Sequence, residues 1–170
     1  MISIRSATES DAAALLEIYR PYVERTAISF ETELPTAEQF AGRIAKCVST
    51  WDWVVAEDDA ACLGYAYGTA HRERAAYRWS VETSVYVRED QHRRGIATRV
   101  YGELLERLKT KGYCNAFAGI ALPNDASVAL HERLGFEMIG AFRRVGWKFG
   151  RWHDVAWLQR RLRDAPIEAP

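Results

Sequence analysis

Cysteine is scarce in this chain, and its spacing excludes two kinds of site. The 170 residues include only three cysteines, Cys47, Cys62 and Cys114. No pair has the C-x-x-C spacing of a zinc knot, and an odd, widely spaced set does not make a disulfide framework. We therefore predict no metal site, and we expect reduced, buried thiols of the kind found in cytoplasmic proteins.

Net charge and long apolar runs are also absent. Lys plus Arg and Asp plus Glu both number 23, so the formal net charge is zero. Any anion-binding site must then be local, which argues against nucleic acid as a partner. No apolar run approaches ~18 residues, and the first residues lack the apolar core of a signal peptide. We therefore expect neither export by that route nor a membrane span.

Repeats, low-complexity tracts and internal linkers are missing as well, which indicates one domain. A chain of 170 residues can bury a core of its own, and 48% apolar with 27% charged residues is typical of globular proteins. We assign residues 1–163 to this domain and residues 164–170 to a loose C-terminal tail.

Hydrophobic periodicity predicts an alternation of strands and helices. We expect strands over 2–5, 51–57, 61–70, 78–87, 114–120, 137–144 and 155–162, and helices over 12–23, after Thr36, over 95–111 and over 124–134. Pro21 should kink or end the first helix. Antiparallel hairpins come first and strand–helix–strand units follow, so we predict an α/β fold whose mixed, mostly antiparallel sheet has helices on both faces.

The segment from Ser84 to Ala97 carries the most specific signal. An alternating strand ends, a basic turn follows, and Gly95 opens an amphipathic helix. Free N–H groups and the helix dipole at such a start attract anions, and Arg93 and Arg94 add positive charge. This order predicts a phosphate cradle, although alone it would also fit an ordinary basic helix start. The Gly-Lys-Ser/Thr of a nucleotide-hydrolysing P-loop does not follow.

Four blocks together resemble the GCN5-related N-acetyltransferases (GNAT), and within them the phosphinothricin and methionine-sulfoximine acetyltransferase branch. They are Tyr77–Val87, His92–Ala97, Asn124–Phe136 and Val145–Val155. The second reads His-Arg-Arg-Gly-Ile-Ala and is similar to the Q/R-x-x-G-x-G/A pyrophosphate motif, except that His92 occupies the first position. The resemblance runs from residue 2 to about 162 and implies a single GNAT-type domain.

The resemblance implies acetyl-CoA as the acetyl donor, with no metal. Backbone N–H groups of the turn would hold its pyrophosphate, and the exposed edge of the preceding strand would pair with its pantetheine arm. The cofactor-binding residues that the resemblance implies are Val85, Tyr86, Val87, Arg93, Arg94, Gly95, Ile96, Ala97, Thr98 and Asn124. A backbone amide near Val85 would polarise the thioester carbonyl. Asn124 also suits the N-cap of the helix that follows it, and both roles can hold.

Glu82 and His131 are the candidates for acid–base catalysis. A mid-strand position disfavours a carboxylate, and an amine with a pKa of roughly 8–10 must lose a proton before it can attack. The resemblance makes Glu82 this general base, acting directly or through a water; the alternative is a solvated carboxylate. His131 stands where many relatives carry a tyrosine that protonates the leaving thiolate, and the alternative is a structural histidine.

The resemblance also implies a small amino-acid-like acceptor such as phosphinothricin, methionine sulfoximine or methionine sulfone. The candidate acceptor-binding residues are Phe30, Arg72, Arg74 and Tyr77. Arginine forks bind carboxylates in two-point contacts, which suits an amino acid, and Arg78 is a further candidate. A solvated basic loop would hold the same arginines. Glu31 stands where some phosphinothricin-type members carry arginine, which weakens the case for that particular acceptor.

Two other functions stay open at this point. The same chemistry could acetylate a protein N-terminus or a lysine, although arginines near the pocket suit an anionic small molecule better. A non-catalytic CoA-binding sensor would need the cradle but no base, and Glu82 argues against it. Direct transfer needs no nucleophilic cysteine.

An aromatic segment near the C-terminus remains. Trp147, Trp152 and Trp157, with Lys148, form a hairpin that we interpret as core or as the interface of a homodimer, the state that the resemblance implies. His71 and His153 receive no role from the sequence.

Overall fold

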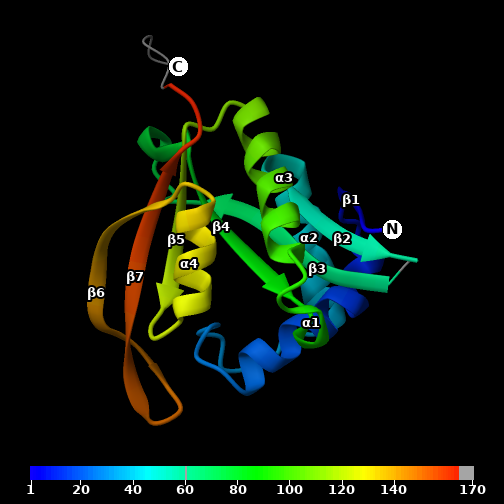
Figure 1. The fold of residues 1–170 in the computed structure, drawn as a ribbon, viewed down its shortest axis with the longest axis horizontal. Coiled ribbons are helices and arrows are strands. Elements are labelled where there is room, and N and C mark those ends of the chain that lie inside the picture. Colours follow the sequence, from blue (N-terminus) through cyan, green and yellow to red (C-terminus); the bar gives the residue numbers. More distant parts are fainter. Residues whose placement is uncertain (60, 165–170) are drawn as a thin grey trace.

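The computed structural model describes residues 1–59 and 61–164, and its centre is a seven-stranded sheet (Figure 1). The strands are β1 (Ser3–Ser6), β2 (Trp53–Asp58), β3 (Ala61–Ala70), β4 (Ser80–Val87), β5 (Asn115–Ala121), β6 (Glu137–Lys148) and β7 (Arg151–Arg161). The helices are α1 (Ala12–Glu24), α2 (Ala37–Thr50), α3 (Ile96–Thr110) and α4 (Asp125–Arg133), with short 3-10 turns η1 (Glu9–Asp11), η2 (Ala75–Tyr77) and η3 (Glu89–Gln91). Except for Asp164, the predicted tail lies outside the described residues.

The strands lie in the order β1-β2-β3-β4-β5-β7-β6, and among them only β4 and β5 pair in parallel. The predicted mixed, mostly antiparallel sheet is confirmed. In the described part of the chain, no helix is long and apolar enough to cross a membrane.

Helices cover both faces of the sheet, as predicted, because side chains alternate along each strand. Along β2, Val54 and Ala56 join a core with α3 and α4, whereas Trp53 and Val55 join a core with α1 and α2. The buried stripe of α3 consists of Ile96, Val100, Tyr101, Leu104, Leu105 and Leu108. Burying a leucine-sized side chain stabilises a fold by about 1.5–3 kcal/mol, so these stripes hold the helices on the sheet.

Two local predictions have different outcomes. Thr36 caps α2: its hydroxyl accepts from the N–H of Gln39 at 3.2 Å, and the Gln39 side chain accepts from the N–H of Thr36 at 2.9 Å. Pro21, in contrast, does not end α1, which runs on to Glu24. The proline removes one backbone hydrogen bond, but Tyr19 and Val23 in the same turns are buried and keep the helix packed.

The last two strands are longer than predicted, and the bounds 137–144 and 155–162 are wrong. β6 and β7 pair as far as Lys148 opposite Arg151. The register shifts between Phe142 and Gly146, and Arg144 has a positive φ of 50°. This bulge interrupts the alternation of side chains, so periodicity does not reveal that one strand continues.

Candidate functional site

A cleft opens where β4 and β5 separate. Their parallel pairing joins Ser80–Glu82 to Asn115–Phe117, and beyond these residues the two strands diverge (Figure 1). The cleft has a volume of about 570 Å³ and lies between the end of β4, the turn before α3 and the start of α4. The predicted cofactor residues that line it are Val85, Val87, Arg93, Gly95, Ile96, Ala97, Thr98 and Asn124.

The turn before α3 has an unusual backbone. Gly95, the N-cap residue, has φ 75°, and Arg93 has φ 62°. Glycine adopts this left-handed conformation without the steric penalty that a β-carbon brings. Gly95 has no side chain to cap the helix, so the first-turn N–H groups of Ile96, Ala97 and Thr98 have no intrahelical partner and are available to an anion.

Tyr86 and Arg94 turn away from this cleft. The Tyr86 ring packs edge-on against Tyr19 and Tyr22, with centroid distances of 4.9 and 5.1 Å, on the face of the sheet covered by α1. Arg94 donates a hydrogen bond to the side chain of Gln91. Neither residue lines the cleft, and the backbone of Tyr86 faces Tyr65 of β3, so the exposed edge of β4 is formed by Val85 and Val87.

His92 fastens the turn to the end of β4. Its Nε2 lies 3.1 Å from the carbonyl oxygen of Val87 and 3.1 Å from the hydroxyl of Tyr22. The Tyr22 hydroxyl donates to the same carbonyl at 2.5 Å. His92, the residue that departs from the motif at its first position, is thus held by partners within the protein.

Asn124 caps α4 as predicted. Its side-chain oxygen accepts from the N–H of Ser127 at 3.2 Å. Asn124 also lines the cleft, so its position is compatible with the predicted contact to a ligand.

Glu82 lies at the point where the strands separate, as the last β4 residue paired with β5. Its Oε1 accepts a hydrogen bond from Arg72 Nη1 at 2.9 Å and lies 3.1 Å from His71 Nδ1. Its side chain is 31% exposed. Two donors hold this carboxylate, so it is not simply a solvated group on an open strand.

His71 is a residue that the sequence did not single out. A carboxylate can only accept, so the His71 Nδ1 that faces Glu82 must carry a proton. The ring stacks on Phe117 with a centroid distance of 4.3 Å and meets the edge of Tyr77 at 5.7 Å. No local pattern signals this contact, because it depends on the antiparallel register of β3 and β4.

His131 lies in the core and is 3% exposed. Its Nδ1 lies 2.7 Å from the carbonyl oxygen of Ser127, and its Nε2 lies 3.1 Å from the hydroxyl of Tyr101. Burial lowers the pKa of His131 below its ordinary value. Ser127 and Leu130 of the same helix line the cleft, whereas His131 is not among the lining residues.

The predicted acceptor residues occupy two places. Arg72 and Tyr77 gather around Glu82 and His71, as described above, and Arg74 is exposed at the start of η2. Phe30 lies instead between α1 and α2, where its ring centroid is 6.0 Å from that of His153 in β7.

Lys148 ties the loop that carries Phe30 to the β6–β7 hairpin. Its ammonium donates to the carbonyl oxygens of Val23 and Ser29 at 2.6 and 2.7 Å, and the residue is only 4% exposed. Burial lowers the pKa of Lys148. His153 also joins this contact, because its Nε2 lies 3.1 Å from the Lys148 carbonyl oxygen. The sequence places Lys148 among aromatic residues but does not predict its contact with the loop between α1 and α2.

No metal centre is evident in the part of the chain that the structure describes, where no three His, Cys, Asp or Glu side chains are grouped to hold an ion.

Comparison with known proteins adds a family and close relatives. Residues 4–157 match the family model described as an acetyltransferase (GNAT) domain. The chain is 37% identical to a phosphinothricin N-acetyltransferase of Streptomyces viridochromogenes, over 99% of this chain and 91% of the relative. It is 40% identical to an L-methionine sulfoximine/L-methionine sulfone acetyltransferase of Pseudomonas paraeruginosa, over 99% of this chain and 98% of the relative.

A solved structure shares the fold over nearly the whole chain. It is a GNAT superfamily phosphinothricin acetyltransferase from Sinorhizobium meliloti in complex with AcCoA, and it superposes with a TM-score of 0.94 at 34% identity. The match covers 99% of this chain and 92% of that one.

Proposed function

The chain belongs to the GNAT acetyltransferase family, and on that premise we propose that it transfers an acetyl group from acetyl-CoA to the amine of a small amino-acid-like acceptor. The names of its relatives support a phosphinothricin or methionine sulfoximine type of acceptor. The complex of a similar structure with AcCoA supports the donor.

The cleft between β4 and β5 suits acetyl-CoA. The first-turn N–H groups of α3 and the side chain of Arg93 offer positive potential for the pyrophosphate. The edge of β4 at Val85 and Val87, which no longer pairs with β5, offers backbone groups to the pantetheine arm. Both features face one cleft, so a single extended ligand can use them together.

Glu82 is the general base in the proposed reaction. Its carboxylate takes a proton from the acceptor's ammonium group, directly or through a water, and the free amine attacks the thioester carbonyl carbon. A carbon–nitrogen bond forms and the carbon–sulfur bond breaks, so CoA leaves as a thiolate that takes up a proton. A backbone N–H near Val85 stabilises the negative charge that develops on the carbonyl oxygen.

The position of Glu82 is the observation that carries this proposal. Glu82 is the last β4 residue before the two strands separate, and Arg72 and His71 hold its Oε1 at 2.9 and 3.1 Å. A base at this position can reach an amine that approaches the thioester end of the cleft.

CoA release with an acceptor panel tests the function. The panel contains phosphinothricin, methionine sulfoximine and methionine sulfone, and peptides with free N-termini serve as the comparison. Glu82→Gln should cut turnover about 100-fold near neutral pH and leave the acetyl-CoA dissociation constant within about two-fold. Equal turnover of both proteins across pH 6–9 would remove Glu82 from the mechanism. Faster acetylation of peptides, or acetyl-CoA binding without any transfer, would favour one of the other two functions.

The thiols support direct transfer rather than a covalent acetyl-enzyme. All three cysteines are free, and burial raises the pKa of Cys47 to about 12 and also raises that of Cys62. Such thiols carry little of the nucleophilic thiolate near neutral pH. Free thiols also support the cytoplasmic location that we propose.

We also propose that the β6–β7 hairpin forms the interface of a homodimer. Its large apolar side chains are about half exposed: Met138, Ile139, Phe142, Val145, Trp147, Phe149 and Trp152. So many large exposed apolar side chains on one hairpin are unusual on a monomer's surface and typical of an interface. Sedimentation velocity should show a dimer for the parent chain and a monomer for Trp147→Glu; a monomeric parent chain would contradict the proposal.

A further inference from the structure

A second cavity lies on the opposite face of the sheet from α3, beneath α2. Its volume is about 560 Å³, within the range of small-molecule sites. Six aromatic rings are among the residues that line it: Trp51 and Tyr67 are partly exposed, whereas Tyr19, Phe40, Trp53 and Tyr65 belong to the core and are at most 5% exposed. We call this cavity the aromatic chamber.

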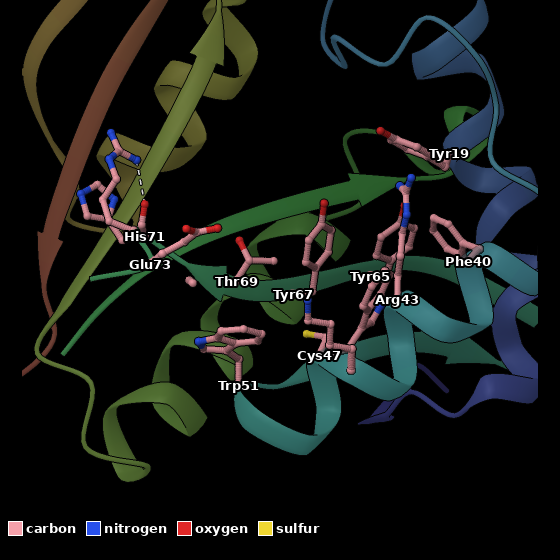
Figure 2. A pocket seen from close by; sticks show the side chains of 14 residues that line it. Tyr19, Phe40, Arg43, Cys47, Trp51, Tyr65, Tyr67, Thr69, His71 and Glu73 are labelled. Atoms are coloured by element: carbon pink, nitrogen blue, oxygen red, sulfur yellow. Dashed lines mark hydrogen bonds between the residues drawn. The ribbon is translucent and has the colours of Figure 1, made fainter. Parts of the chain in front are cut away.

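The rings of the aromatic chamber are ordered against one another. Trp53 stacks on Tyr67 with a centroid distance of 4.3 Å and on Tyr65 at 5.4 Å. In Figure 2 the tips of Arg43, Tyr67 and Thr69 point to one side of the chamber, and Trp51 and Cys47 lie at the opposite side. The chamber therefore combines an apolar floor with a polar rim.

The aromatic chamber reaches the carboxylate that we propose as the base. His71 and Arg72, the two residues that hold Glu82 Oε1, also line the chamber. Thr69, another lining residue, is paired directly with Glu82 across β3 and β4, so the two side chains lie side by side on the same face. The aromatic chamber thus begins at Thr69, next to Glu82, where the proposed reaction places the acceptor's amine.

We propose that the aromatic chamber receives the side chain of the acceptor, and that amino acids with a large aromatic side chain are acceptors beside those of the phosphinothricin and methionine sulfoximine type. The inference rests on the proposed acetyltransferase function and names its substrate class. With the amine at Glu82, the side chain extends past Thr69 toward Trp51 and Tyr67. Aromatic rings stack favourably in such a site, by about 0.5–1.5 kcal/mol beyond the area that they bury.

The carboxylate of such an acceptor also has a partner. Arg72 uses Nη1 for its hydrogen bonds to Glu82 and to the carbonyl of His71. Its remaining guanidinium donors, Nη2 and Nε, can bind the carboxylate that lies next to the amine in an amino acid.

A series of acceptors at saturating acetyl-CoA tests the inference. We expect kcat/KM for L-tryptophan and L-phenylalanine to exceed that for L-alanine by ten-fold or more. Indole, which has the ring without the amino-acid part, should inhibit competitively against L-phenylalanine and not against acetyl-CoA.

A variant that fills the aromatic chamber provides the structural test. Thr69→Phe keeps a strand-forming residue on β3 and should lower the tryptophan-to-alanine ratio of kcat/KM at least ten-fold and abolish inhibition by indole. The matched control is Thr110→Phe, at an exposed position at the end of α3, which should leave the ratio unchanged. Since a ratio within one protein is compared, a partial loss of folded enzyme does not affect the result.

The outcomes separate the two proposals. Acetylation with no preference for aromatic side chains, or a preference that survives Thr69→Phe, overturns the aromatic chamber's role and leaves the acetyltransferase function intact. Failure of every acceptor to be acetylated overturns the proposed function and this inference with it.

Discussion

Gly146 lies against the ring of Phe30, with no space between them for a β-carbon. The contact joins the β6–β7 hairpin to the loop between α1 and α2, and Lys148 fastens the same two segments through the carbonyls of Val23 and Ser29. A predicted acceptor residue is therefore held in place by a distant part of the chain. Changes at this contact should affect the acceptor rather than acetyl-CoA.

Gly146→Ala tests this separation. The added methyl must displace the Phe30 ring, and overpacking of this kind costs about 1–3 kcal/mol. We expect KM for the acceptor to rise several-fold while the dissociation constant for acetyl-CoA stays within about two-fold. The control is Gly102→Ala in α3, where a β-carbon meets no neighbour within 4 Å. An equal effect on both substrates would show that Phe30 does not act on the acceptor side.

His71→Ala tests whether the ring positions Glu82. Without its Nδ1–H, the carboxylate keeps only the hydrogen bond from Arg72, so kcat should fall about ten-fold with little change in the KM for acetyl-CoA. An unchanged kcat would leave His71 with a packing role against Phe117.

His131→Gln separates a structural role from a catalytic one. The pKa of His131 is lowered in the fold, so the unfolded chain binds the extra proton more readily between that lowered pKa and the ordinary value of 6.5. Stability of the parent chain should therefore rise with pH through this window and be lost as pH falls below about 6.5. Thermal unfolding across pH 5–8 should show a flatter profile for the variant.

The turnover of His131→Gln tests whether His131 donates the proton to the leaving CoA thiolate. Both ring nitrogens of His131 have partners in the core, so we expect kcat to change by no more than about three-fold where both proteins are folded. A loss of about 100-fold would instead support the general-acid role that the family resemblance implies.

His92→Gln and Gly95→Ala form a matched pair for the phosphate cradle. If backbone N–H groups supply most of the binding, His92→Gln should change the acetyl-CoA dissociation constant by only a few-fold, roughly 1 kcal/mol. Gly95→Ala places a β-carbon on a residue with φ 75°, which distorts the turn itself, and should weaken binding more. Isothermal titration measures both, and the reverse order would assign the cradle to the side chain of His92.

Local features of the site could be read from the sequence because they depend on neighbouring residues. The turn at Gly95, the first-turn N–H groups of α3 and the N-cap at Asn124 are each formed within a few residues. Pro21 and the bulge after Phe142 misled the same reasoning, because packing around them outweighed the local signal.

Local sequence was thus sufficient to predict the sheet class, the helices on both faces and the glycine turn that begins α3. Tertiary structure alone brought His71 to Glu82, Lys148 to Ser29, and the rings of the aromatic chamber together. These contacts depend on strand register and on the closure of long loops, where a shift of one residue would turn each side chain to the other face. Short-range periodicity does not specify that register, so it could predict the turn at Gly95 but not the residues that surround the proposed base.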